Sequence, residues 1–219
     1  MKRTLVFASG GADVGGSGFR KLVESSLSGI LKAEIISVVS NYPNGGVKKI
    51  ADEFGINFIY FPGPFNAVEY RKIVERYEPD LIALSGWIKF VRGLDPKITI
   101  NIHPGPLPKY GGQGMHGHNV HEAIIKDYSE GKILFSAVSM HFVIEDGYDE
   151  GPAFFSYPVY IGQDYDANKI GAEVNKIEHG WQAYITNLVL EGKIYWDGKD
   201  PKSLVVPEYV PRIFIKGSE

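Results

Sequence analysis

The first half of the chain alternates short apolar runs with segments in which apolar residues recur every three or four positions. The short runs are rich in β-branched and aromatic residues and end in small or polar ones, which is typical of strands buried on both faces. We expect strands at 5–9, 34–40, 57–61, 81–86 and 98–102, and helices at 18–33, 45–55 and 65–79. Strand and helix in alternation predict right-handed crossovers and a parallel sheet.

The second half has a different pattern. A helix is expected near 115–127, and two longer apolar runs follow it at 133–143 and 153–161, joined by an acidic turn. These runs predict antiparallel strands added to the parallel sheet. Between 165 and 191, apolar residues are spaced 4, 3, 4, 4 and 3 positions apart, which predicts one long amphipathic helix.

We therefore expect an α/β fold with a mostly parallel, twisted sheet, a Rossmann-like first half, helices on both faces and antiparallel strands in the second half. With 219 residues, against about 100–200 for a typical domain, one domain is expected. Residues 1–100 would form a nucleotide- or phosphate-binding half and 101–192 the catalytic half. The proline-containing segment 193–219 would form a peripheral tail.

Composition narrows the possible functions. A net charge of −3 gives no general attraction for nucleic acid or an anionic membrane, so small-molecule substrates are expected. The absence of cysteine excludes disulfides, thiol nucleophiles and thiolate-bound zinc, and it suits a reducing compartment. No apolar run approaches the roughly 18 residues of a membrane span, and the first apolar run is short for a secretory signal. We expect a cytoplasmic protein, either a monomer or a homodimer.

The end of the run at 98–102 carries the first candidate chemistry. Asn101 and His103 share one face because side chains alternate along a strand, and ligands of a doubly wound sheet bind beyond the carboxyl ends of its strands. Three prolines and three glycines follow within ten residues and would stiffen the loop. The alternative is structural: Asn101 caps a turn and His103 is a hydrogen-bonded core histidine.

A second histidine, His141, lies near the end of another apolar run, directly before the acidic turn. That turn contains Glu145, Asp146, Asp149 and Glu150. One carboxylate beside an imidazole could orient it or shift its pKa, as general acid–base catalysis near neutral pH requires. For most of these acids, a solvated turn is the competing interpretation.

Two motifs resemble a known family. Residues 101–112 read N-I-H-P-x-x-L-P-x-Y-x-G, and residues 141–152 begin with H-F-V and end with D-x-G-P. They resemble the 10-formyltetrahydrofolate-dependent formyltransferases, and the length is most similar to that of the single-domain members of the purine pathway. The resemblance covers about residues 3–190.

The resemblance implies transfer of a formyl group from 10-formyltetrahydrofolate, a cosubstrate, to the amine of glycinamide ribonucleotide in de novo purine biosynthesis. It maps the catalytic roles to Asn101, His103 and Asp149. The Asn101 amide would stabilise the tetrahedral oxyanion, His103 would donate to it or relay a proton, and Asp149 would hold the imidazole. Neither a metal nor a covalent intermediate is required.

The resemblance also implies the ligand-binding residues. The substrate phosphate would meet the glycine-rich turn at Gly15, Gly16, Ser17 and Gly18. Other substrate contacts would come from Gly86, Pro104 and Glu178. The folate would bind Trp87, Ile88, Lys89, Phe90, Val91, His141, Val143, Glu145 and Asp146. The competing interpretations are a plain tight turn, an exposed helix acid and ordinary core packing; the glycines form no clean dinucleotide-binding G-x-G-x-x-G.

The cluster His116, His118 and His121 suggests zinc, because three imidazoles can bind it. No fourth ligand is evident in the sequence, and the family that the chain resembles uses no metal. We therefore expect that the protein binds no metal and that one of these histidines supports His103 or the loop.

Three departures from the family pattern matter, and a fourth accompanies them. Gly18 stands where the phosphate loop usually has Asn, and the helix opening at 65–71 lacks a basic residue near its start, for which Arg71 is a candidate substitute. The loop from His141 to Asp149 is one residue longer than usual, so Asp149 is preferred to Asp146 on the D-x-G-P ending. Gly105-Pro106 also replaces the commoner Ser-Leu.

These departures bear on the acceptor more than on the chemistry. Hydrolysis of formyltetrahydrofolate and formylation of another amine, such as an amino sugar, remain alternatives. A folate- or nucleotide-binding module without turnover is the alternative from a different class, and retention of Asn101, His103 and Asp149 argues against it.

Overall fold

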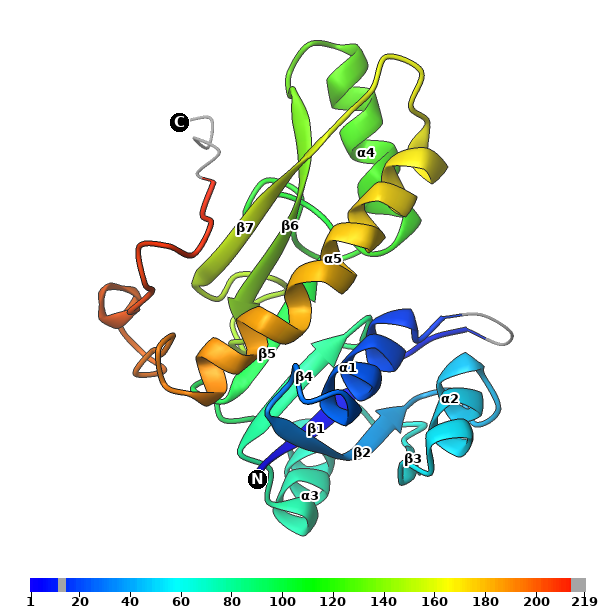
Figure 1. The fold of residues 1–219 in the computed structure, drawn as a ribbon, viewed down its shortest axis with the longest axis vertical. Coiled ribbons are helices and arrows are strands. Elements are labelled where there is room, and N and C mark those ends of the chain that lie inside the picture. Colours follow the sequence, from blue (N-terminus) through cyan, green and yellow to red (C-terminus); the bar gives the residue numbers. More distant parts are fainter. Residues whose placement is uncertain (12–14, 214–219) are drawn as a thin grey trace.

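The computed structural model describes residues 1–11 and 15–213. Seven strands form one sheet in the order β3-β2-β1-β4-β5-β6-β7 (Figure 1). The strands span Lys2–Phe7 (β1), Ala33–Ser40 (β2), Phe58–Tyr60 (β3), Leu81–Ser85 (β4), Thr99–His103 (β5), Phe135–Phe142 (β6) and Ala153–Tyr160 (β7). Each overlaps an apolar run from which a strand was expected.

The sheet is parallel from β3 through β5, and β6 and β7 add to it in antiparallel orientation. The predicted fold class, with a Rossmann-like parallel first half and antiparallel strands in the second half, is therefore confirmed. Because the strand order reverses between β1 and β4, the loops that follow these two strands diverge and leave a crevice at the carboxyl edge.

Helices cover both faces of the sheet (Figure 1). The larger apolar core lies beneath four helices, namely α1 (Ser17–Leu27), α2 (Gly46–Phe54), α4 (His118–Ser129) and α5 (Ala167–Leu190). The second core lies on the opposite face beneath α3 (Ala67–Tyr77) and contains Leu5, Phe7, Tyr70 and Trp87. Leu5 and Phe7 face α3 while Val6 between them faces the larger core, as alternation along a buried strand requires.

The first helix is shorter than expected. A helix was predicted over 18–33, but α1 ends at Leu27. Gly29 adopts a left-handed φ of 77°, a backbone conformation that stops a helix and that glycine adopts without steric cost. Ile30 is exposed, whereas Leu31 is buried in the larger core.

The segment from residue 193 was expected to be peripheral. In its described part, Ile194, Trp196 and Val210 are buried within the larger core. Tyr195 pairs with Val205 in an isolated antiparallel bridge, and a short 3-10 helix, η1, spans Pro201–Ser203. This part of the segment therefore packs against the sheet and its helices. Its buried side chains follow no regular periodicity in the sequence, so their burial was not predicted.

Among the described residues, none of the helices combines the length and apolar character needed to cross a membrane.

Candidate active site

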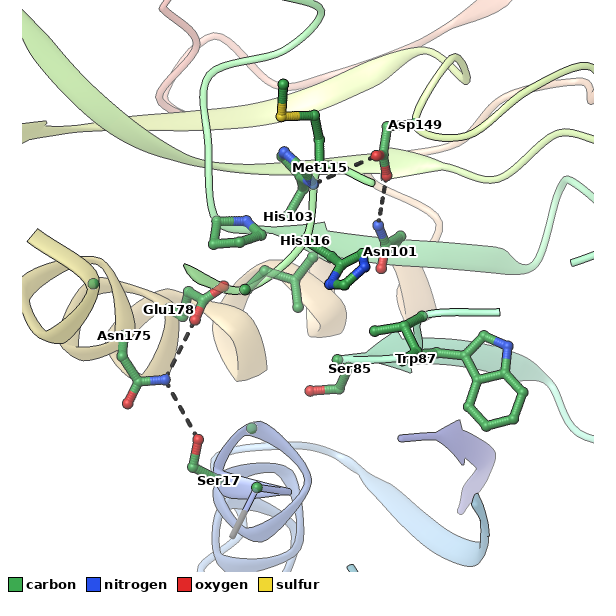
Figure 2. A pocket seen from close by; sticks show the side chains of 18 of the residues that line it. Ser17, Ser85, Trp87, Asn101, His103, Met115, His116, Asp149, Asn175 and Glu178 are labelled. Atoms are coloured by element: carbon green, nitrogen blue, oxygen red, sulfur yellow. Dashed lines mark hydrogen bonds and ion pairs between the residues drawn. The ribbon is translucent and has the colours of Figure 1, made fainter. Parts of the chain in front are cut away.

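A cavity of about 730 Å³ opens at the carboxyl edge of the parallel strands. Its walls are formed by the turns after β1 and β4, the end of β5, the loop between β5 and α4, and one face of α5 (Figure 2). This is the switch point at which the strand order reverses, the usual ligand site of such sheets.

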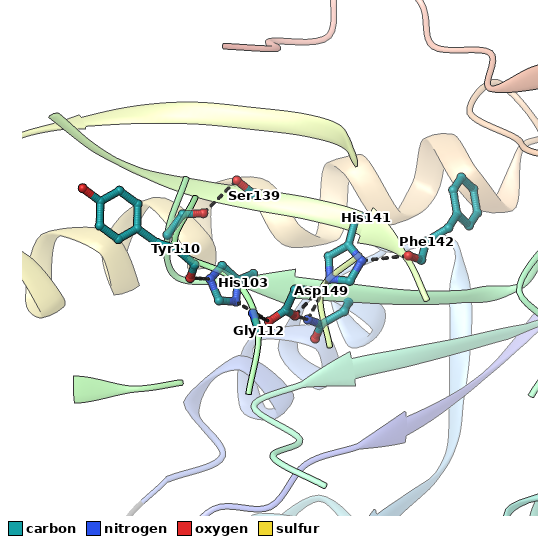
Figure 3. A network of polar contacts seen from close by, with 9 residues as sticks. His103, Tyr110, Gly112, Ser139, His141, Phe142 and Asp149 are labelled. Atoms are coloured by element: carbon teal, nitrogen blue, oxygen red, sulfur yellow. Dashed lines mark hydrogen bonds and ion pairs between the residues drawn. The ribbon is translucent and has the colours of Figure 1, made fainter. Parts of the chain in front are cut away.

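The three residues expected to carry the chemistry come together on one wall of the cavity. Asn101 and His103 project from the same face of β5, and Asp149 reaches them from the loop between β6 and β7 (Figures 2 and 3). The Asn101 amide Nδ2 donates to Asp149 Oδ1 over 3.2 Å. His103 Nδ1 lies 3.6 Å from Asp149 Oδ2. All three line the cavity.

Two backbone groups set the orientation of His103 and Asp149. The Tyr110 carbonyl lies 2.8 Å from His103 Nε2, and because a carbonyl only accepts, Nε2 carries the hydrogen. Nδ1 is therefore the nitrogen that faces Asp149 and can take up a proton. The Gly112 N–H donates to Asp149 Oδ2 over 3.2 Å, so the proline- and glycine-rich loop holds both members of the pair.

His141 also belongs to this polar network. It lies opposite Asn101 in the antiparallel pairing of β5 and β6, and only 2% of it is exposed. Its Nδ1 donates to the Phe142 carbonyl over 2.7 Å, and its Nε2 lies 3.3 Å from Asp149 Oδ1 (Figure 3). The resemblance implied a folate contact for His141; the structure places its imidazole behind Asp149.

Burial and neighbouring groups shift the pKa values of His103 and Asp149. Burial lowers the pKa of His103 and outweighs the neighbouring Asp149 carboxylate, which raises it. Burial raises the pKa of Asp149, but its interactions with His141, with His103 and with the Gly112 N–H outweigh burial and hold that pKa below its usual range. At neutral pH the site therefore pairs an ionised Asp149 with a neutral His103, which can accept a proton.

The loop backbone decides which acid reaches the imidazole. Asp149 has a φ of 58°, in the left-handed region that Asp and Asn adopt more readily than most residues. Asp146, three residues earlier, is exposed. Glu145 accepts a hydrogen bond from the Gly93 backbone and so ties the loop to the turn after β4.

The glycine-rich turn after β1 lies on the opposite side of the cavity. Gly15, Gly16, Ser17 and Gly18 all line it, whereas residues 12–14 of the turn lie outside the described part of the chain. Gly16 precedes α1 with a φ of 86°, and α1 has neither a side-chain cap nor an acid in its first turn. Its first N–H groups and the positive end of its dipole thus lie at the cavity, and among the described residues the first turn of the helix supplies no acid to them.

The predicted substrate contacts Gly86, Pro104 and Glu178 line the same cavity. Glu178 lies on α5, where Asn175 Nδ2 is 3.4 Å from its Oε2. Burial raises the pKa of Glu178 to about 7, and the hydrogen bond from Asn175 offsets only part of this effect. Glu178 can therefore be either an acceptor or a donor for a bound ligand near neutral pH.

The strip expected to hold the folate divides between cavity and core. Trp87 and Ile88 line the cavity, but the Trp87 ring also packs in the second core and donates to the Tyr70 hydroxyl over 3.0 Å. The described lining does not include the remaining predicted folate residues, Lys89, Phe90, Val91, His141, Val143, Glu145 and Asp146. Phe90 packs against Tyr148, a lining residue, with ring centroids 4.7 Å apart.

The three clustered histidines do not converge. His116 and His121 line the cavity, whereas His118 pairs with Glu122 over 3.3 Å on the outside of α4. Burial lowers the pKa of His121 to about 4. In the part of the chain that the structure describes, no three His, Asp or Glu side chains are grouped to hold a metal ion.

Sequence reasoning missed several polar residues of the site. Ser85, the last residue of β4, and Asn175 and Gln182, which flank Glu178 on α5, all line the cavity. Helical spacing was the available signal for the α5 pair, since positions three before and four after Glu178 share its face. Ser85 gives no comparable signal, because strands commonly end in a small polar residue.

Fold and site together define an α/β enzyme of the doubly wound class. Its Asn–His–Asp constellation faces a cavity that also meets a helix N-terminus, an arrangement suited to proton transfer on a small anionic substrate.

Residues 2–188 match the Formyl transferase family, and the chain belongs to it. It is 30% identical over 228 residues to the chloroplastic phosphoribosylglycinamide formyltransferase of Vigna unguiculata, covering 98% of this chain and 69% of that protein. It is 27% identical to the phosphoribosylglycinamide formyltransferase of Bacillus subtilis, covering 87% and 95%. The crystal structure of glycinamide ribonucleotide transformylase 1 from Symbiobacterium toebii shares the fold, with a TM-score of 0.77, 22% identity and coverage of 91% and 92%.

Proposed function

We propose that this protein transfers the formyl group of 10-formyltetrahydrofolate to the amine of glycinamide ribonucleotide, a step of purine biosynthesis. Membership of the Formyl transferase family and the names of the relatives from Vigna and Bacillus support the reaction and its acceptor. The observation that carries the proposal is the contact of Asn101 and His103 with Asp149 on the wall of a cavity that reaches the start of α1.

The cavity suggests where each part of the substrates binds. The phosphate of the ribonucleotide would lie at the N-terminus of α1, against Gly15, Gly16, Ser17 and Gly18. Its amine would then lie at Asn101, and its sugar between the two, within reach of Glu178. The pterin would bind beside Ile88 and Tyr148, so that the formyl carbon comes between the amine and Asp149.

The chemistry requires one bond to form, one to break and one proton to move. The amine attacks the formyl carbon. One Asn101 amide hydrogen stays on Asp149 Oδ1, and the oxyanion that forms takes the place of His141 Nε2, 3.1 Å from Asn101 Nδ2, as the acceptor of the other. His103 Nδ1 takes the proton released by the attacking amine, and the ionised Asp149 stabilises the resulting imidazolium. The carbon–nitrogen bond to the folate breaks as N10 of the folate takes up that proton.

We also propose the compartment and the partners of the reaction. The small-molecule substrates follow from the family, whereas a cytoplasmic location rests on the absence of cysteine, which suits a reducing compartment. A net charge of −3 disfavours nucleic acid as a partner.

A turnover assay with a panel of amines tests the acceptor. Purified protein receives 10-formyltetrahydrofolate with glycinamide ribonucleotide, an amino sugar phosphate or water alone, and loss of the formyl group is followed. We expect turnover with the ribonucleotide at least 100-fold above the other two. Equal loss of formyl in water would indicate a hydrolase, and faster turnover with the amino sugar would identify a different acceptor.

A further inference from the structure

A buried pair of neutral polar side chains lies on the cavity wall between the phosphate turn and Asn101. Ser85 ends β4, Gln182 reaches it from α5, and the two are 5% and 2% exposed. Gln182 Nε2 donates to Ser85 Oγ over 3.1 Å. The pair joins elements 97 positions apart in the chain and takes no part in the Asn101–Asp149 network.

Two hydrogen-bonding groups of this pair, the Ser85 hydroxyl hydrogen and Gln182 Oε1, have no partner among the described residues. Because Ser85 Oγ accepts from Gln182, the hydroxyl hydrogen remains available for donation to another group. Among the residues that the structure describes, Gln182 Oε1 has no hydrogen-bond partner, although that atom is buried. A buried acceptor without a partner is unfavourable, so its retention beside a cavity indicates a ligand that completes the bonding.

Gly18 makes room for the Ser85 hydroxyl. A Cβ built on Gly18 would lie 2.3 Å from Ser85 Oγ and 3.4 Å from Gln182 Oε1. Any side chain at position 18 would therefore displace the serine hydroxyl or be displaced by it. Gly18, Ser85 and Gln182 thus form one interdependent set, and the departure of Gly18 from the expected phosphate-loop sequence has a steric explanation.

The position of the pair identifies the part of the substrate that it would meet. Ser85 lies directly opposite Ile102, the neighbour of Asn101, in the pairing of β4 and β5. In Figure 2 its hydroxyl points into the space bounded by Ser17 and Glu178. A ribonucleotide with its phosphate at α1 and its amine at Asn101 would place its sugar in this space.

We propose that Ser85 and Gln182 form a neutral subsite that binds a sugar hydroxyl of the ribonucleotide and so determine specificity for it. A hydroxyl both accepts and donates, which matches the Ser85 hydrogen and the free Gln182 oxygen. The inference rests on the proposed function, because it takes the ribonucleotide as the acceptor substrate.

The test compares Ser85→Ala, Gln182→Met and the double variant by steady-state kinetics. Gln182→Met keeps the length and apolar packing of the side chain but removes both hydrogen-bonding groups. We expect each single variant to raise KM for the ribonucleotide roughly 10-fold, with KM for 10-formyltetrahydrofolate within twofold of wild type. The double variant should add little to either single change, because the pair acts as a unit.

Analogues of the ribonucleotide that lack one sugar hydroxyl provide the matched control. For the analogue that lacks the bound hydroxyl, wild type and Ser85→Ala should have equal KM, whereas the other deoxy analogue should retain the difference. Melting temperatures identify any variant that fails to fold, and Ser85→Ala, which only removes an oxygen, keeps the test decisive if Gln182→Met unfolds.

The outcomes separate this inference from the proposed function. If wild type formylates the ribonucleotide and the folded variants have unchanged KM, or an equal KM increase for every analogue, the inference alone is overturned. If wild type neither binds the ribonucleotide in a calorimetric titration nor formylates it, the proposed function fails and the subsite assignment falls with it.

Discussion

Replacement of Asp149 by Asn tests the charge that the site holds against its imidazole. The substitution keeps the shape of the side chain, and Asn tolerates the left-handed φ of 58° at this position. Backbone strain, which Ala would introduce here, is therefore avoided. What is removed is the negative charge 3.6 Å from His103 Nδ1.

The magnitude follows from that distance. Two unit charges 3.6 Å apart interact by about 4–5 kcal/mol at an effective dielectric constant of about 20. The net loss should be smaller, because the Asn dipole still stabilises the imidazolium in part and because solvent at the partly exposed carboxyl already weakens the interaction in wild type. We therefore expect kcat to fall by roughly 10²–10³-fold. KM for both substrates should stay within a fewfold of wild type, because the loss arises where His103 becomes charged.

The matched control is Asp146→Asn, which removes an exposed charge from the same loop. Its kcat should remain within about twofold of wild type, as expected for a surface charge. The assay is steady-state formyl transfer over a range of pH. Because Asp149 raises the His103 pKa, its removal should also shift the acidic limb of the kcat profile to lower pH. A folded Asp149→Asn protein with kcat within threefold of wild type would refute the reasoning.

Three further perturbations test other parts of the site. His103→Ala should reduce kcat by roughly 100-fold or more and leave KM for the ribonucleotide nearly unchanged, and a normal kcat in a folded variant would remove the imidazole from the reaction. Ser17→Asp places a carboxylate at the start of α1, where it should stabilise the helix but repel the substrate phosphate. KM for the ribonucleotide should then be at least 10-fold higher than in the Ser17→Asn control, and equal KM values would argue against a phosphate at this helix end. The pKa of Glu178 is about 7, against 4.5 in an unfolded chain, so this residue contributes stability that is complete below pH 4.5 and is lost as the pH rises through 7. In urea unfolding, the free energy of unfolding of Glu178→Gln relative to that of wild type should therefore rise by roughly 1–3 kcal/mol between pH 5 and pH 8. A difference that does not change with pH would contradict that pKa.

The regular elements were predictable because burial on both faces leaves a direct trace in the sequence. Strands such as Leu81–Ser85 have five buried residues in succession, and only an apolar run satisfies that environment. The long helix α5 was predictable from its apolar stripe. The early end of α1 was missed because a single glycine conformation at Gly29, rather than any change in hydrophobicity, stops it.

Asn101, His103 and Asp149 were predictable as candidates because two of them share a strand face and a motif supplied the third. Their geometry was not, because it depends on the backbone of distant loops, as the Tyr110 carbonyl at His103 shows. The Ser85–Gln182 hydrogen bond gave no signal at all, since it joins positions 97 residues apart. Tertiary contacts of this kind follow from the packing of α5 against the sheet and not from any local pattern.

The most direct test of formyl transfer at this site is a single-turnover experiment with 10-formyltetrahydrofolate labelled with an isotope in the formyl carbon. Protein in excess is mixed with the labelled folate and glycinamide ribonucleotide, and the products are separated. We predict that the label appears on the amine of the ribonucleotide, with its rate reduced by roughly 10²–10³-fold in Asp149→Asn and unchanged in Asp146→Asn. Release of the label as formate at the same rate with and without ribonucleotide would contradict the account.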